Sequence, residues 1–247
     1  MAWASTTSAF TSGTSEASGT TIVSGSVIWT AARAYTAIVA TDNFATTEGN
    51  SNEHSSITDS LGNTWVKAYE WNNEGAAAGK ATASVWHMKC TTGGTSTCTV
   101  NLANAVTAKA FQVQEWTIGA SNVVSVEGTP VGVSADGADA GSLTVGSLTS
   151  AEYLFIRSDA IETATSAYTV TTNFSAIGGV STAGGGDASN MSVYGEYRIL
   201  TGTTSTSDPT TENSDQAAVF VALKEAAPPV VTGLGWAYGG LSGSGWF

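Results

Sequence analysis

The sequence predicts an all-β fold, a two-sheet antiparallel sandwich of jelly-roll type that takes up most of the 247 residues. Three observations support this prediction. Short runs rich in β-branched and aromatic residues recur along the chain, clusters of Gly, Ser, Asn and Asp separate them, and helical periodicity is almost absent. About ten such runs with turns between them are typical of two sheets that Greek-key connections bury against each other.

The clearest run lies at residues 57 to 71, where a turn cluster at residues 59 to 63 leads into a strand. A period of two places Trp65, Lys67, Tyr69 and Trp71 on one face of that strand and Glu70 on the other. Each aromatic side chain buries roughly 150–250 Å² when it is packed. We therefore expect a core built on Trp65, Tyr69, Trp71, Trp86 and Trp116.

The remaining runs fill the chain in order, with polar or glycine-rich segments between them. Predicted strands cover residues 27 to 29, 34 to 40, 81 to 89, 98 to 102, 110 to 118, 142 to 148, 153 to 157, 167 to 174, 191 to 200 and 216 to 223. The Gly/Ala/Asp/Ser segment at residues 119 to 142 is predicted to be a crossover loop, and residues 177 to 190 a second loop.

Composition divides the chain into three parts. Residues 1 to 19, rich in Ser, Thr and Gly, are predicted to form an N-terminal arm or an irregular edge element, and residues 20 to 226 the β-sandwich domain. Pro228 and Pro229 end the last strand, because proline donates no ladder hydrogen bond. Residues 227 to 247 then form a Gly/aromatic tail.

Charge limits the partners that the protein can have. Only 11% of the residues are charged, and the formal net charge of −12 repels phosphate backbones and anionic lipid surfaces. We therefore expect neither a nucleic acid nor a membrane as a partner. Residues 1 to 10 lack a secretory signal, and no apolar run reaches the ~18 residues that span a bilayer. The expectation is synthesis in a cytoplasm, or a signal already removed.

Two cysteines, Cys90 and Cys98, flank a Gly-Gly turn that is predicted to close a hairpin. Opposed strand residues there come within disulfide reach, so a disulfide and two reduced, half-buried thiols both stay open. The spacing is not that of a metal site, and we expect no metal.

Motifs for hydrolysis are missing from the sequence. A glycosidase needs two carboxylates that face a cleft, but Glu70, Glu115, Glu152 and Glu196 occur singly on predicted strands, where we expect them at the solvent or at the rim. No Gly-x-Ser-x-Gly elbow occurs, and His54 and His87 are the only histidines. The expectation is a protein without catalytic residues or a cofactor.

Two features of the sequence suit a binding site, and each also has a simpler interpretation. The segment at residues 134 to 141 carries Asp136 and Asp139, which suit either a calcium ion or a flexible acidic loop, and we favour the loop. The tryptophans that could stack on sugar rings must mostly fill the core instead; they are Trp29, Trp71, Trp86 and Trp116.

Four segments carry a family resemblance. They are residues 34 to 43 (AYTAIVATDN), 59 to 65 (DSLGNTW), 84 to 89 (SVWHMK) and 112 to 116 (QVQEW). In this order they resemble recurring blocks of a β-sandwich family found in bacteriophage structural, decoration and fibre proteins and in some bacterial surface proteins. The resemblance covers residues 20 to 226. It implies a jelly-roll or concanavalin-like sandwich in a virion or surface context, and it transfers no catalytic residue.

Three functions from different classes follow. We expect a non-enzymatic virion protein that decorates a capsid or forms part of a fibre, exposed on the particle and made in the host cytoplasm. A glycan-binding surface adhesin is the alternative, and a degraded hydrolase is the third. The resemblance implies other virion proteins as partners and a homo-oligomer, a trimer by analogy. Apolar residues of both chain ends are the predicted docking contacts, namely Leu234, Trp236, Tyr238, Leu241, Trp246, Phe247, Trp3 and Phe10.

Overall fold

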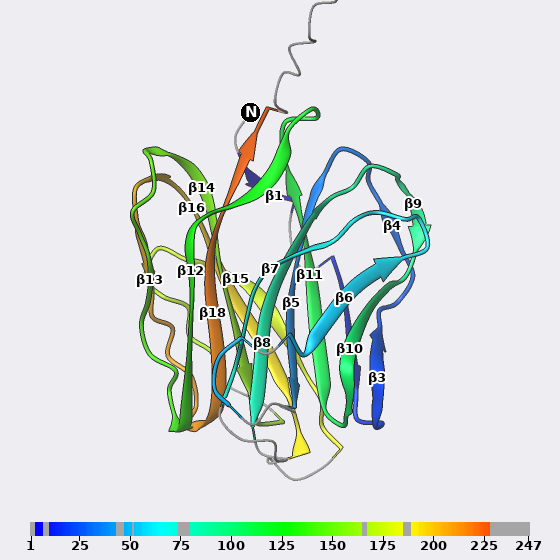
Figure 1. Cartoon of the computed structure of the whole chain (residues 1–247), viewed down its shortest axis with the longest axis vertical. Coiled ribbons are helices and arrows are strands. Elements are labelled where there is room, and N and C mark those ends of the chain that lie inside the picture. The colour runs from blue at the N-terminus through cyan, green and yellow to red at the C-terminus, as the bar shows by residue number, and fades with distance from the viewer. Residues whose placement is uncertain are drawn as a thin grey trace, which may run out of the picture.

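The computed structural model describes residues 3–6, 10–42, 47–50, 52–73, 80–164, 167–184 and 189–227, and in these ranges it is an all-β protein of antiparallel sheets. This confirms the predicted class and is consistent with a β-sandwich. Figure 1 shows the sheets lying against one another as layers along the long axis of the molecule.

The middle layer, called here the central sheet, has the strand order β1-β11-β5-β8-β7, and β2 also pairs with β11. Its strands are β1 (Ala4–Ser5), β2 (Thr11–Ser15), β5 (Ala34–Asp42), β7 (Val66–Asn72), β8 (Ala81–Lys89) and β11 (Lys109–Thr117). Every residue of β5 is buried, and so is nearly every residue of β8. A strand buried on both faces needs a layer on each side.

The five-stranded sheet covers one face, with the order β12-β18-β14-β16-β15. Its strands are β12 (Val123–Ala138), β14 (Ala151–Ile161), β15 (Ser175–Ser181), β16 (Ser192–Gly202) and β18 (Ser214–Ala226). A core that includes Ile38, Val85, Ile156 and Val221 lies between this sheet and the central sheet. The ribbon of β13 (Leu143–Val145) and β17 (Ser205–Ser207) adds to a further core on its outer side.

The three-stranded sheet covers the other face, with the order β3-β10-β6. It consists of β3 (Gly19–Val23), β10 (Cys98–Val106) and β6 (His54–Asp59), and the ribbon of β4 (Val27–Trp29) and β9 (Gly94–Ser96) lies beside it. Trp29, Trp65, Trp86 and Met88 belong to the core that it shares with the central sheet. The protein therefore has three main layers, where the sequence predicted two sheets.

A β-bulge changes the predicted arrangement of the organising strand. Lys67 pairs with Trp86 and Tyr69 pairs with Val85, so Ala68 is an extra residue in β7. Trp65 before the bulge packs on the three-stranded side, whereas Tyr69 and Trp71 after it pack toward the five-stranded sheet. The expectation that these aromatics share one face is wrong, because the extra residue reverses the alternation.

Two segments predicted to be loops are strands. Residues 119 to 142 contain β12, and residues 177 to 190 contain most of β15. Conversely, of residues 167 to 174 only Thr169 makes a β-bridge, to Thr210. Small side chains allow close packing in the two missed strands: a Cβ at Gly132 of β12 would lie 2.6 Å from the Trp71 ring.

The described residues near the N-terminus form strands at an edge of the central sheet, the second of the two predicted forms. β1 and β2 pair in succession along the edge of β11 that β5 does not use. Trp3 is only 3% exposed and is part of the core between the central and five-stranded sheets. Phe10 is half-buried against Trp29 and Tyr35, with ring centroids 5.0 Å and 4.9 Å away. Packing on their own sandwich therefore accounts for both residues.

Candidate functional site

A group of buried polar side chains lies between β6 and the central sheet. His54, the first residue of β6, is fully buried. Its Nε2 atom lies 2.9 Å from Thr41 Oγ1 on β5, and its Nδ1 atom lies 2.6 Å from Ser84 Oγ on β8. One imidazole thus connects the three-stranded sheet to two strands of the central sheet.

Glu70 on β7 belongs to the same cluster. Its carboxylate accepts hydrogen bonds from the backbone N–H groups of Glu53 and His54, and Lys67 Nζ lies 2.8 Å from Glu70 Oε2. The bulge at Ala68 makes this possible, because it places Lys67 and Glu70 on the same face of β7. Thr82 donates a hydrogen bond to the Glu53 carboxylate beside them.

Burial sets the charge state of the imidazole. It lowers the pKa of His54 to about 4, although the nearby Glu70 carboxylate acts in the opposite direction. His54 is therefore neutral at pH 7, and one of its ring nitrogens can accept a hydrogen bond from a hydroxyl. Burial likewise lowers the pKa of His87 to about 4.

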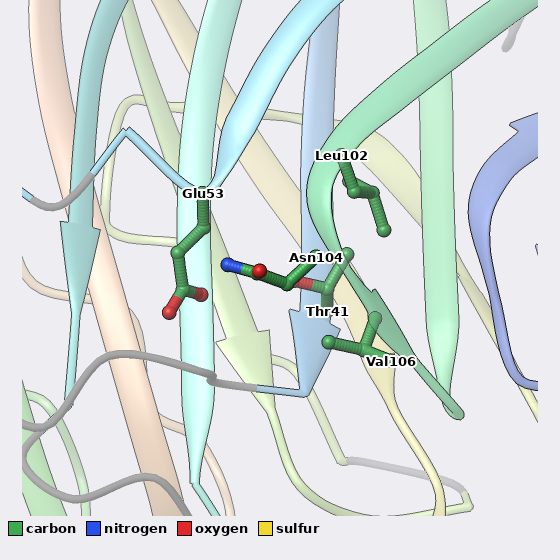
Figure 2. A pocket seen from close by; sticks show the side chains of 5 residues that line it. All are labelled: Thr41, Glu53, Leu102, Asn104 and Val106. Atoms are coloured by element: carbon green, nitrogen blue, oxygen red, sulfur yellow. The ribbon is translucent and has the colours of Figure 1, made fainter.

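A shallow hollow opens toward this cluster. Figure 2 shows Glu53 on one side with the Asn104 amide pointing toward it, and Thr41, Leu102 and Val106 close the rest of the lining. The hollow has no room for a water-sized sphere. The Ser84–His54 contact has the distance of a nucleophile–base pair, but a substrate cannot reach it because both residues are fully buried.

A second buried cluster lies on the outer side of the five-stranded sheet. Arg157 on β14 pairs with Asp159, with 2.8 Å between Nη2 and Oδ1, and its Nη1 donates to the carbonyl of Gly141 at 2.7 Å. Glu196 on β16 accepts hydrogen bonds from Thr171 Oγ1 at 2.7 Å and Ser207 Oγ at 2.6 Å. These bonds fix two connecting segments and the β17 ribbon onto the sheet.

The carboxylates singled out in the sequence therefore have other roles than expected. Glu70 and Glu196 are fully buried, so their predicted position at the solvent or rim is wrong. Glu115 accepts a hydrogen bond from the Tyr35 hydroxyl, and Glu152 accepts one from the Trp3 backbone at 2.8 Å. All four hold parts of the fold. Alternation alone does not reveal this, because both faces of the central sheet and part of the outer face of the five-stranded sheet are covered.

The aromatic residues predicted for the core divide into two groups. Trp65, Trp86 and Trp116 are buried, at 8%, 3% and 0% exposure. Tyr69 and Trp71 are half-buried and stack with ring centroids 6.2 Å apart. Trp29, a candidate for sugar stacking, is also buried.

The two cysteines are unbridged and buried. They do not face each other across a hairpin, because Cys90 follows β8 of the central sheet and Cys98 begins β10 of the three-stranded sheet. The chain crosses between layers there and pairs β9 with β4 on the way. Burial, together with the nearby Asp59 carboxylate, raises the pKa of the Cys98 thiol.

The described residues offer neither a cluster of metal ligands nor a membrane-spanning helix. Within the described residues, no group of three or more His, Cys, Asp or Glu side chains is placed to hold a metal ion. Asp139 instead accepts hydrogen bonds from the Gly141 and Thr211 backbones, and Asp136 pairs with Lys80 at 2.6 Å. No helix in the described part of the chain is long and apolar enough to cross a bilayer.

The predicted docking contacts of the C-terminus lie outside the described residues; they are Leu234, Trp236, Tyr238, Leu241, Trp246 and Phe247. Comparison with known proteins gives no relative. No family model matches the chain, and neither the curated proteins nor the solved structures contain a detectable match.

Proposed function

We propose that the protein is a non-enzymatic structural component of a bacteriophage particle, either a capsid decoration protein or part of a fibre. One observation carries the proposal. The buried ionisable groups that could support catalysis, above all His54, Glu70 and Glu196, are bonded to strands and turns of the protein itself. Their hydrogen bonds hold strands, turns and layers of the fold together.

This use of polar groups suits a protein whose task is to keep its shape. A buried carboxylate that loses its partners is strongly destabilising, so each such group holds a particular arrangement of strands. The surface also suits exposure outside a cell, because only eight Lys and Arg residues offer sites to trypsin-like proteases. Two of these, Lys109 and Arg157, are fully buried.

The family resemblance adds the jelly-roll or concanavalin-like topology and the virion context to this proposal. Docking through the chain ends now rests on residues 227 to 247 alone, since Trp3 and Phe10 pack on their own sandwich. We propose that this segment binds another virion protein, and that copies of the chain associate. A trimer is supported by analogy only.

The test is to locate the protein in its native source. Particles purified from that source, labelled with an antibody to residues 20 to 226 and viewed by electron microscopy, should carry the label at regular positions. Mass spectrometry of the same particles should find the chain in many copies. A source whose particles lack the protein, or a preparation that hydrolyses a polysaccharide and stops doing so on Glu196→Gln, would refute the proposal.

A glycan-binding adhesin remains the second candidate because of the Tyr69–Trp71 stack, which is half-buried rather than enclosed. Trp71 also lies over Gly132, so one face of its ring is covered. A glycan array with Trp71→Ala as the matched variant separates the two functions. Binding that the variant loses favours the adhesin, and the absence of binding favours the virion protein.

A further inference from the structure

The outward face of the three-stranded sheet is a regular array of small uncharged side chains. Ile22, Ile57 and Val100 point into the core, so alternation turns their neighbours outward. Register across the three strands groups the outward residues in two rows, Val23–Thr99–Thr58 and Thr21–Asn101–Ser56. Directly paired residues of antiparallel strands lie on the same face, so the six side chains form one surface.

This surface, called here the neutral face, stands out by its lack of charge. The strands β3, β4, β6, β9 and β10 contain no Lys, Arg or Glu. Their one carboxylate, Asp59, accepts hydrogen bonds from Leu61 and Asn63 of the following turn. The five-stranded sheet and its connections, by contrast, place acidic side chains at the surface, among them Asp136, Asp208 and Glu212.

The neutral face also lies beside the most exposed aliphatic side chains. Among the described residues, four large hydrophobic side chains are exposed, and the two most exposed are Ile28 at 71% and Val23 at 52%. Val23 belongs to the array, and Ile28 lies on β4, which follows β3 in the chain. Contiguous apolar surface commonly marks an interface, and Val23 adds apolar area to the uncharged array.

The net charge of the chain bears on how a second copy could bind to this face. Two copies that each carry a formal charge of −12 repel each other, and the repulsion is smallest where neither surface presents a charge. We propose that the neutral face binds the same face of a second copy, as a two-fold pair of sheets. This inference rests on the homo-oligomer part of the proposed function, but it assigns a two-fold contact in place of the trimer suggested by analogy, and it names the surface that makes the contact.

A neutral contact between like-charged copies has a distinctive salt dependence. Association should strengthen as salt rises from about 0.01 M to about 0.15 M, because the Debye length shortens from roughly 30 Å to roughly 8 Å and screens the repulsion. A contact made by opposite charges would weaken over the same range. Sedimentation velocity of the full chain over a concentration series measures the dimer fraction at each salt concentration.

A matched pair of variants tests the location. Thr58→Glu places a carboxylate in the array on an edge strand, and it removes a hydroxyl that accepts a 3.4 Å hydrogen bond from Asn101. Thr206→Glu makes the same change at the exposed middle residue of β17, where the hydroxyl lies 2.8 Å from that of Thr144. Thr58→Gln has nearly the same shape as Thr58→Glu without the charge.

The expected result is a dimer whose association weakens roughly tenfold or more in Thr58→Glu, because like charges then meet across the contact. Thr206→Glu and Thr58→Gln should stay close to the unchanged protein, and circular dichroism should show all variants folded. A chain that is monomeric at every salt concentration, or equal losses in the two Glu variants, would overturn the inference. So would a monomer that binds the neutral polysaccharide dextran through Thr58. None of these outcomes bears on whether particles carry the protein.

Discussion

Ala32, in the turn between β4 and β5, has a φ of 62°, in the left-handed region that favours glycine. An alanine there costs about 1–2 kcal/mol, whereas a glycine loses roughly 0.5–1 kcal/mol more conformational entropy on folding. We therefore expect Ala32→Gly to raise the free energy of unfolding by up to about 1 kcal/mol. Urea unfolding measures it. Ala31→Gly is the control, because Ala31 has no positive φ, and it should lower the free energy of unfolding. If both variants changed this free energy equally, the backbone strain assigned to Ala32 would be contradicted.

His54 should make stability fall in mild acid. Its pKa is lowered from 6.5 to about 4 in the folded protein, so its contribution is complete above pH 6.5 and is lost as pH falls toward 4. Between pH 4 and pH 6.5, His54 is protonated in the unfolded chain but neutral in the folded protein. At about 1.36 kcal/mol per pKa unit, the loss amounts to roughly 3 kcal/mol.

The variant His54→Gln should remove this part of the pH dependence, measured as the free energy of unfolding in urea at several pH values. Ser84→Ala is the matched control, because it breaks the 2.6 Å contact but keeps the imidazole. His87 titrates in the same window, and Asp42, whose pKa burial raises, acts in the opposite direction. The difference between His54→Gln and the unchanged protein isolates His54, and identical pH profiles would contradict the assignment.

At the scale of elements, β16 packs against the central sheet through a glycine. A Cβ at Gly195 would lie 2.8 Å from the Arg157 carbonyl oxygen and 2.8 Å from Ile38 Cδ1. Gly195→Ala should therefore lower the free energy of unfolding by about 1–3 kcal/mol, the usual effect of overpacking. Gly19→Ala is the control, since its nearest neighbour is 3.9 Å away. If Gly195→Ala and Gly19→Ala changed the melting temperature equally, β16 would be able to shift and the predicted overpacking would be contradicted.

Element prediction from the sequence succeeded where residue type and alternation agree. β8 was predicted with its observed bounds, because Val85, Trp86 and Met88 favour strands. β12 and β15 were missed, because their glycines and serines are typical of loops, although in β12 Val131 and Val133 alternate with small residues. Such residues suit a strand that a large side chain of the neighbouring layer covers, as Trp71 covers Gly132.

The candidate site depends on features that pattern analysis does not contain. Glu70 meets His54 only because Ala68 is an extra residue in β7, and nothing in the residue types at 66 to 70 marks a bulge. His54 meets Ser84 across two layers, so the contact depends on the stacking order of the sheets. The sequence did predict the Asp59 turn, which follows from the local hydrogen-bonding habit of aspartate.

For the whole molecule, the sandwich should be complete without its last residues. β18 ends at Ala226 and is already paired with β12 up to that residue, so truncation after Ala227 should leave the melting temperature nearly unchanged. The shortened protein should nevertheless fail to join its particle, because residues 228 to 247 supply the proposed anchors. Unfolding of the truncated chain, or normal incorporation measured by mass spectrometry of purified particles, would contradict docking through this segment.

The position of β18 has a mechanical consequence. This strand lies between β12 and β14 and pairs antiparallel with both, and the proposed anchor follows directly after it. A pull on the anchor would act along β18, so its two ladders would be loaded in shear, with many hydrogen bonds resisting at once. A hairpin pulled at its open end would release its bonds one by one. A protein anchored to its particle through this central strand would therefore resist being pulled off by flow better than a protein anchored through an edge strand.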